Sequence, residues 1–135
     1  RGPAVPFLLE RPMDAETVRS AARVLLALAM VGVGVLHFVV PKGFARIVPR
    51  SLPNPMALVY VSGVFEILGG VGLLVPFART FSAWGLVALF VAVFPANVNM
   101  AVNRIQLPGK PLPTWALWAR LPFQLVFIAW ALWVR

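Results

Sequence analysis

The chain has 135 residues, of which 61% are hydrophobic and 12% are charged, and its mean hydropathy is +0.89. A soluble domain of this length needs more polar residues to cover its surface, so the composition excludes an ordinary soluble fold. The sequence contains no cysteine, which excludes disulfides, Cys-ligated zinc, iron–sulfur clusters and thiol redox chemistry on this chain.

The formal net charge of +8 comes from basic residues that gather near the ends of the apolar segments. Lysine and arginine at helix ends anchor a membrane protein against anionic lipid headgroups. We therefore expect phospholipid, and no nucleic acid, as the partner of these charges. The residues concerned are Arg11, Arg19, Arg23, Lys42, Arg46, Arg50, Arg79, Arg104, Lys110 and Arg135.

Residues 1–18 are predicted to form an N-terminal arm, because prolines interrupt them and Asp14 is a suitable N-cap for a following helix. The first apolar segment, residues 20–40, ends at Pro41. Roughly 20 residues, at about 1.5 Å of rise each, cross a hydrocarbon core of about 30 Å. This segment is therefore long enough to span a membrane.

The loop at residues 41–55 has a short amphipathic pattern. Three apolar residues share one side of a helical turn, and three basic residues supply charge. Such a pattern is typical of a segment that lies in the membrane interface. The apolar residues are Phe44, Ile47 and Val48, and the basic residues are Lys42, Arg46 and Arg50.

Two further segments, residues 56–76 and 81–102, are also long enough to span. The connection between them, residues 77–80, permits only a tight turn, so these helices should be antiparallel neighbours. Glycines at positions 63, 69, 70 and 72 leave the first of them with little bulk, which favours close approach to another helix.

The loop at residues 103–114 is rich in proline and glycine and is expected to cross in an extended form. A fourth apolar helix, residues 115–134, follows it, with tryptophans near both of its ends, as in interfacial aromatic belts. We therefore predict an all-α polytopic membrane protein, with an antiparallel four-helix transmembrane bundle over residues 19–135.

Glu66 is the only acidic residue after Glu16, and it lies near the middle of an apolar segment. A central charged side chain costs about 2.5–3.5 kcal/mol on insertion scales, so it normally faces a partner or a cavity. Counting residues inward from the loop-bearing face gives a polar layer. In this count His37 and Asn99 are shallow, Tyr60, Asn97 and Arg120 are deeper, and Glu66 and Gln124 are deepest.

Helical phase supports part of this layer. Ser62 and Glu66 are four residues apart and share a face, as do Arg120 and Gln124, whereas Asn97 and Asn99 point in different directions. We predict a ligand pocket that opens to one membrane face. Its candidate residues are His37, Tyr60, Ser62, Glu66, Asn97, Asn99, Arg120 and Gln124.

Each of these residues also has a structural interpretation. Glu66 and Arg120 could form an ion pair that only locks the bundle, and the asparagines could only bond helices together. His37 is a lone histidine without further ligands, so no metal site is predicted. The sequence shows no nucleophile–base pair that assigns catalytic residues. Catalysis by this chain alone is not expected.

Four strings, one in each apolar helix, resemble the DoxX-like family of small membrane proteins. They begin at Gly34, Glu66, Pro95 and Arg120 and read GVLHF, EILGGVGLL, PANVNMA and RLPFQ. The resemblance covers about residues 20–135. It implies a four-helix membrane bundle and an association with respiratory or redox systems.

Three functions follow as hypotheses. The first is an accessory subunit of a redox-associated membrane complex, with a pocket for quinone or lipid and with other membrane subunits as partners. The second is a small-solute transporter or permeation subunit, and the third is a purely structural subunit of a larger assembly. The chain itself is expected to carry no cofactor other than a bound quinone. A multi-pass location in a prokaryotic inner membrane is expected.

Overall fold

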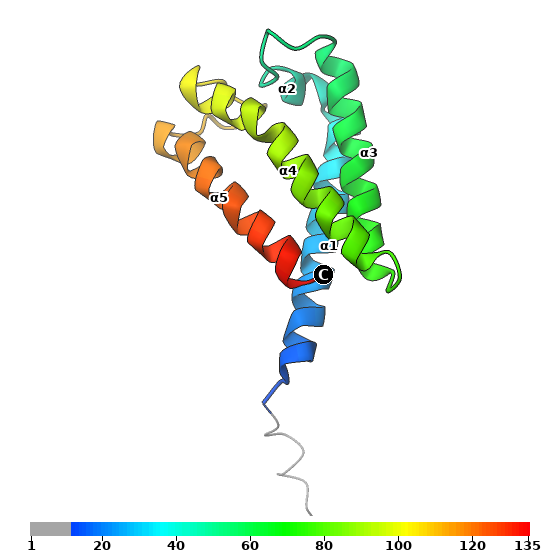
Figure 1. Cartoon of the computed structure of the whole chain (residues 1–135). Coiled ribbons are helices and arrows are strands. Elements are labelled where there is room, and N and C mark those ends of the chain that lie inside the picture. The colour runs from blue at the N-terminus through cyan, green and yellow to red at the C-terminus, as the bar shows by residue number, and fades with distance from the viewer. Residues whose placement is uncertain (1–11) are drawn as a thin grey trace, which may run out of the picture.

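The structure, a computed structural model, describes residues 12–135 and confirms the all-helical four-helix architecture (Figure 1). Four of its helices are long and apolar enough to cross a membrane, so the chain is a multi-pass membrane protein. The helices are α1 (Ala15–Val39), α2 (Pro41–Ala45), α3 (Pro55–Leu74), α4 (Arg79–Val102) and α5 (Thr114–Trp133).

The observed helix bounds extend the predicted ones mainly at the start of α1. The predicted arm at residues 1–18 lies partly outside the described residues, and α1 begins within it, at Ala15. The predicted N-cap is confirmed, because an Asp14 carboxylate oxygen accepts a hydrogen bond from the Thr17 amide at 2.7 Å. The first turns of α1 are polar, which explains why the apolar pattern alone missed them.

Helices α1 and α3 pack closely because glycines lie at their contact. A Cβ atom on Gly34 would lie 2.8 Å from the Gly63 carbonyl oxygen, and one on Gly70 would lie 2.8 Å from the Ala27 carbonyl oxygen. No larger residue fits at these positions without moving a backbone. The prediction that the glycines of this helix permit close approach is therefore confirmed for α1.

Helices α3 and α4 are antiparallel neighbours, as the short connection between them predicted. The Arg79 Nε donates a hydrogen bond to the Leu73 carbonyl oxygen at 3.2 Å, which satisfies a carbonyl in the last turn of α3. Helix α5 packs mainly along α4, and the two lean away from α1 towards the end that carries α2 (Figure 1). The fold is thus two helix pairs joined through the α3–α4 contact.

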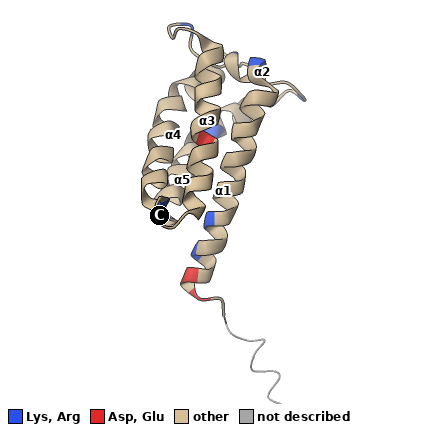
Figure 2. Cartoon of the chain, turned by 90° about the vertical axis from the view of Figure 1, so that its right-hand side faces the viewer, with Lys and Arg blue, Asp and Glu red and all other residues tan. Residues whose placement is uncertain are grey.

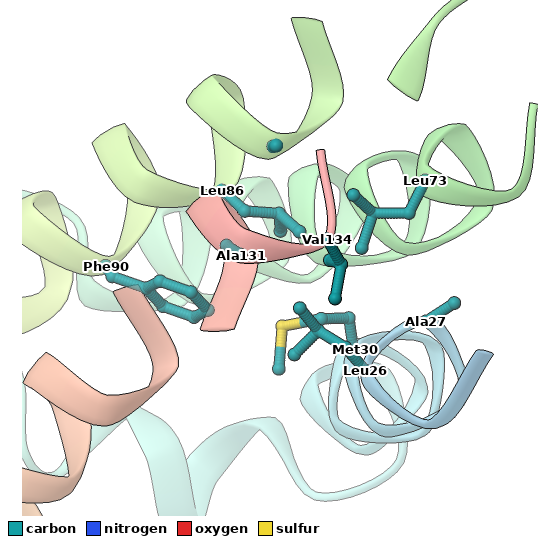
Figure 3. Packing of buried hydrophobic residues seen from close by; sticks show 9 residues of the cluster. Leu26, Ala27, Met30, Leu73, Leu86, Phe90, Ala131 and Val134 are labelled. Carbon is teal, nitrogen blue, oxygen red and sulfur yellow. The ribbon is translucent and has the colours of Figure 1, made fainter. Parts of the chain in front are cut away.

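The end of the bundle where α5 finishes is solid. Side chains from all four long helices meet there in one apolar cluster (Figure 3). Two polar contacts tie α5 to α1 beside it: Arg23 Nε donates to the Val134 carbonyl oxygen at 2.8 Å, and Trp130 Nε1 donates to that of Ala22 at 3.1 Å. The buried members are Leu26, Ala27, Met30, Leu73, Ala83, Leu86, Phe90, Ala131 and Val134.

The opposite end is covered by residues 41–52, here named the α2 segment. Its Ile47 carbonyl oxygen accepts a hydrogen bond from Asn99 Nδ2 of α4 at 2.8 Å. Ile47 also packs with Met100, Ala101 and Leu117. The predicted amphipathic pattern is confirmed, since the three apolar residues face inward and Lys42, Arg46 and Arg50 are exposed.

Charged residues divide along the bundle as a membrane protein requires. Most basic residues lie near the two ends, although Arg120 lies within α5, and in the body of the bundle α3 carries an acidic position, Glu66 (Figure 2). Glu66 is only 7% exposed. A buried carboxyl within a membrane-spanning helix normally faces a partner or a cavity.

Candidate functional site

Two cavities lie between the helices at the end covered by the α2 segment. The first, the polar cavity, has a volume of about 370 Å³ and is lined by residues from all four long helices. The second, the apolar cavity, has a volume of about 330 Å³ and lies between α3, α4 and the α2 segment. Both fall in the roughly 300–1,000 Å³ range of small-molecule sites.

The polar cavity brings together four of the predicted site residues. Glu66 reaches it from α3, Asn97 from α4, and Arg120 and Gln124 from α5. Phe90, Phe123 and Phe127 form aromatic walls around them, and Met30 and Val33 of α1 close one side. The convergence of acid, guanidinium and amides on one space fits the predicted pocket, and the aromatic walls are a feature that the polar pattern did not reveal.

Gln124 is fully engaged by the protein itself. Its Oε1 accepts a hydrogen bond from Asn97 Nδ2 at 2.8 Å, and its Nε2 donates to the Phe90 carbonyl oxygen. That carbonyl lies next to the one at Val91, which loses its usual helical donor because Pro95 has no N–H group. Gln124 therefore binds the α4 backbone one residue before the carbonyl that Pro95 leaves without a donor, and it holds Asn97 in place.

Glu66 has a partner that the sequence did not indicate. His37 Nδ1 lies 3.2 Å from Glu66 Oε2 and 2.8 Å from the Val33 carbonyl oxygen. A carbonyl oxygen can only accept, so Nδ1 carries a proton and donates it there. The His37 ring is also stacked on Phe44 of the α2 segment, with centroids 4.1 Å apart.

This contact corrects the predicted order of depths. The residue count placed His37 nearer the membrane face than Glu66, but the two side chains touch. The cause is the register of α1 against α3, because His37 packs on Gly63 and the first two turns of α3 extend beyond the end of α1. Distance from a helix end is therefore not depth when neighbouring helices end at different levels.

The hypothesis of a Glu66–Arg120 ion pair is wrong for this structure. Both residues line the polar cavity, but among residues 12–135 the charged or titratable group within 4.0 Å of the Glu66 carboxyl is His37, and the buried Glu66 Oε2 accepts no hydrogen bond from the protein. Within the same residues, the half-buried Arg120 guanidinium makes neither a hydrogen bond nor an ion pair with protein groups. It therefore presents donors to the space it lines.

Two more predicted residues, His37 and Ser62, line the apolar cavity, and among residues 12–135 its other lining residues are apolar. Val93 borders both cavities, and the His37–Glu66 contact lies between them. The single predicted pocket is therefore two spaces that share a wall. The sequence predicted one pocket because the spacing of residues along a helix shows which of them share a face. It does not show which neighbouring helix packs against that face.

Tyr60 and Asn99 line neither cavity, which corrects their assignment to the pocket. Tyr60 is stacked on Phe38 of α1, with centroids 5.4 Å apart, and is partly exposed on the outside of the bundle. Asn99 bonds to Ile47, and its Oδ1 accepts from Asn103 Nδ2 at 2.6 Å. The expected difference in direction between Asn97 and Asn99 is confirmed.

A family model described as a domain of unknown function, DUF8561, matches residues 26–135. The chain belongs to this family. No curated protein and no solved structure matches the chain.

The part of the chain that matches DUF8561 contains every lining residue of both cavities. It begins inside α1, so Arg23, which bonds to the end of α5, precedes it. Within residues 12–135 no three His, Asp or Glu side chains gather in a set that could hold a metal ion. The lining residues of the two cavities offer hydrogen-bonding groups, charge and aromatic rings.

Proposed function

We propose that this DUF8561 protein is a membrane subunit whose polar cavity binds the head of a quinone within a redox-associated complex. The observation that carries the proposal is the convergence of Glu66, Asn97 and Arg120 on one cavity with aromatic walls. A quinone head is a flat ring with carbonyl oxygens at its edge. It needs donors at that edge and apolar surface against its faces.

The polar groups that remain available match both redox forms of such a ring. Arg120 supplies N–H donors that suit a quinone carbonyl oxygen. The Glu66 carboxyl and the Asn97 Oδ1 can accept the hydroxyl protons of a quinol, since the Asn97 Nδ2 already donates to Gln124. Donors and acceptors thus line the same space.

The walls of the polar cavity suit a ring. Phe90 and Phe127 lie with centroids 6.0 Å apart in a tilted arrangement, and Phe127 is stacked on Trp130 at the same separation. Aromatic pairs prefer offset or tilted contacts of about 4.5–7 Å, so a ligand ring can extend this series without moving it.

The DoxX-like resemblance of the four helical strings supports the redox setting and a prokaryotic inner membrane. Because the chain has no cysteine, electrons would reach a bound quinone from a bound cofactor or from a partner subunit. Partner subunits therefore belong to the proposal. A site of this kind holds and orients the head, and supplies protons through neighbouring groups.

The direct test is quinone retention by protein purified gently from its native membrane. Wild-type protein is expected to yield quinone on solvent extraction and to protect the cavity from a quinone-based photoaffinity probe. Arg120→Gln should lower apparent affinity by at least about tenfold, because hydrogen bonds to charged groups contribute about 1.5–3 kcal/mol. Glu66→Gln should keep quinone binding and impair quinol binding.

Arg104→Gln is the matched control, since this exposed arginine lies in the loop after α4 and lines neither cavity. It should retain quinone as the wild type does. Labelling that excess quinone fails to displace, or equal retention by wild type and Arg120→Gln, would contradict the proposed site.

A further inference from the structure

We infer that the apolar cavity holds one acyl chain of an anionic phospholipid whose phosphate rests on Lys42, Arg46 and Arg50 of the α2 segment. This inference concerns the second cavity and does not depend on quinone binding in the first. It assigns a stoichiometric lipid site at a defined place, beyond the general attraction of basic helix ends for a bilayer.

The wall chemistry of the apolar cavity suits a hydrocarbon chain. All its lining residues except His37 and Ser62 are apolar. The His37 Nδ1 already donates to the Val33 carbonyl oxygen, so the Nε2 edge of the ring is the one that remains for other partners. A space with so few polar groups cannot hold ordered water well, because buried water needs two to four polar partners.

The cavity borders the surface that faces lipid. Val61 and Phe65 of α3 line it and are also 51% and 57% exposed. Both lie in a membrane-spanning helix, so the medium at this opening is acyl chains. A lipid chain can therefore enter sideways, between α3 and α4, without crossing water.

The α2 segment places charge above this apolar space. Its residues Phe44, Ile47 and Val48 line the cavity, and its three basic residues are exposed. Among residues 12–135 the acids are Asp14 and Glu16, at the far end of α1, and the buried Glu66. The described chain thus offers these three cations no carboxylate on their own face.

The segment is fixed relative to the cavity. Asn99 of α4 donates to the Ile47 carbonyl oxygen at 2.8 Å, and Gly43 packs so closely on Pro108 that a Cβ atom there would lie 2.6 Å from the ring. Because the basic residues and the cavity are held at fixed positions, they favour a ligand whose negative charge and hydrocarbon chain are a fixed distance apart. A phospholipid has that form.

Headgroup charge, more than the chain, should decide which lipid is held. A chain that moves from the bilayer into the cavity exchanges one apolar environment for another, with little net gain. Each Lys or Arg near an anionic headgroup strengthens binding by roughly fivefold, so three cations together favour an anionic lipid by up to about 100-fold.

Native mass spectrometry of the full chain, released from mixed micelles, tests this inference. The probes are phosphatidylglycerol and phosphatidylcholine with identical chains, offered in equal amounts. Wild-type protein should retain one phosphatidylglycerol in preference to phosphatidylcholine by at least tenfold. The triple variant Lys42→Gln, Arg46→Gln, Arg50→Gln should lose this preference, whereas Arg104→Gln with Lys110→Gln, on the other loop of the same face, should keep it.

A second variant tests the chain separately from the charge. Ser62→Leu places bulk in the apolar cavity and should lower retention of both lipids several-fold, while Ser62→Ala should not. Helical circular dichroism confirms that each variant is folded. Equal retention of the two lipids by wild type, or loss of preference in the control pair as large as in the triple variant, would overturn the inference. Quinone content, measured in the same samples, should not follow these changes.

Discussion

The two ends of the bundle are built from the same four helices but packed in opposite ways. At the end where α5 finishes, buried apolar side chains from the four long helices pack into one cluster (Figure 3). At the end covered by the α2 segment, the helix pairs lean apart and enclose two cavities. The solid end holds the helices together, and the hollow end has room for other molecules.

The difference has a physical origin in the sequence of α4 and α5. Both helices contain a proline, Pro95 and Pro122, and both prolines lie in the half of their helix that borders the hollow end. A proline removes a backbone hydrogen bond and bends a helix. In a bilayer no hydrophobic force collapses the resulting space, because lipid chains are as apolar as leucine. A hollow region can therefore persist and be filled by a ligand or lipid.

The largest expected effect compares two leucines on α4. Leu86 is 1% exposed in the solid cluster, whereas Leu89 is partly buried, packs against the edge of that cluster and also lines the apolar cavity. Leu86→Ala should lower the free energy of unfolding by about 2–4 kcal/mol, because it leaves a new void. Leu89→Ala should cost about 1 kcal/mol, since its side chain already borders empty space. Unfolding by SDS titration in mixed micelles measures both, and equal losses would remove the distinction between the ends.

The next effect concerns the contact that closes the solid end. Arg23→Gln removes the Nε donor to the Val134 carbonyl oxygen and should lower the free energy of unfolding by about 1–2 kcal/mol. Arg19→Gln is the control, because within residues 12–135 Arg19, like Arg23, pairs with the exposed Glu16 at 3.7 Å but makes no bond to α5, and such pairs contribute about 0–1 kcal/mol. If both variants lose the same stability, the bond to α5 is not what closes this end.

The fold could be predicted because each transmembrane helix is a continuous apolar segment of sufficient length. The roles of the glycines facing α1 and of the Asp14 N-cap could also be predicted, since each acts through local geometry. The convergence of Glu66, Arg120 and Gln124 was predicted from their counted depths, with helical phase in support, although α3 and α5 are not in direct contact. The N-cap and the glycine contact each depend on one helix or on its immediate neighbour.

The partner of Glu66 could not be predicted, because it depends on the register of α1 against α3. His37 reaches Glu66 since Gly63 lets the two backbones approach, and the sequence gives no measure of that offset. The division into two cavities depends likewise on which helices lean apart. The α2 segment showed its amphipathic pattern, but its stacking of Phe44 on His37 is a tertiary contact with no local signal.

A smaller effect separates two asparagines at the hollow end. Asn97→Ala and Asn99→Ala should each lower the free energy of unfolding by about 0.6 kcal/mol, the average for interhelical hydrogen bonds in membranes. Only Asn99→Ala should also loosen the α2 segment, because it removes the bond to Ile47. Amide hydrogen exchange of residues 41–52 distinguishes them. Faster exchange there in Asn97→Ala would show that the α2 segment depends on the polar cavity instead.

The smallest effect is a pH dependence at the start of α1, which leads into the solid end. The Asp14 carboxylate accepts hydrogen bonds from the Thr17 side chain and backbone, and these lower its pKa below the ordinary value of 3.8. A lowered pKa in the folded state means that the cap stabilises the helix above that ordinary value. The stabilisation is lost as the pH falls through the lowered pKa.

Nuclear magnetic resonance of the Thr17 amide measures this titration directly. The amide signal should move with a midpoint below 3.8, while amides of the solid end stay constant because α1 loosens only in its first turn. Asp14→Asn keeps a capping oxygen but cannot titrate, so it should abolish the transition and leave the helix start in place. A midpoint at or above 3.8 would mean that Asp14 does not cap α1 in solution. A transition that reached Leu26 would mean that the first turn and the solid end unfold as one unit.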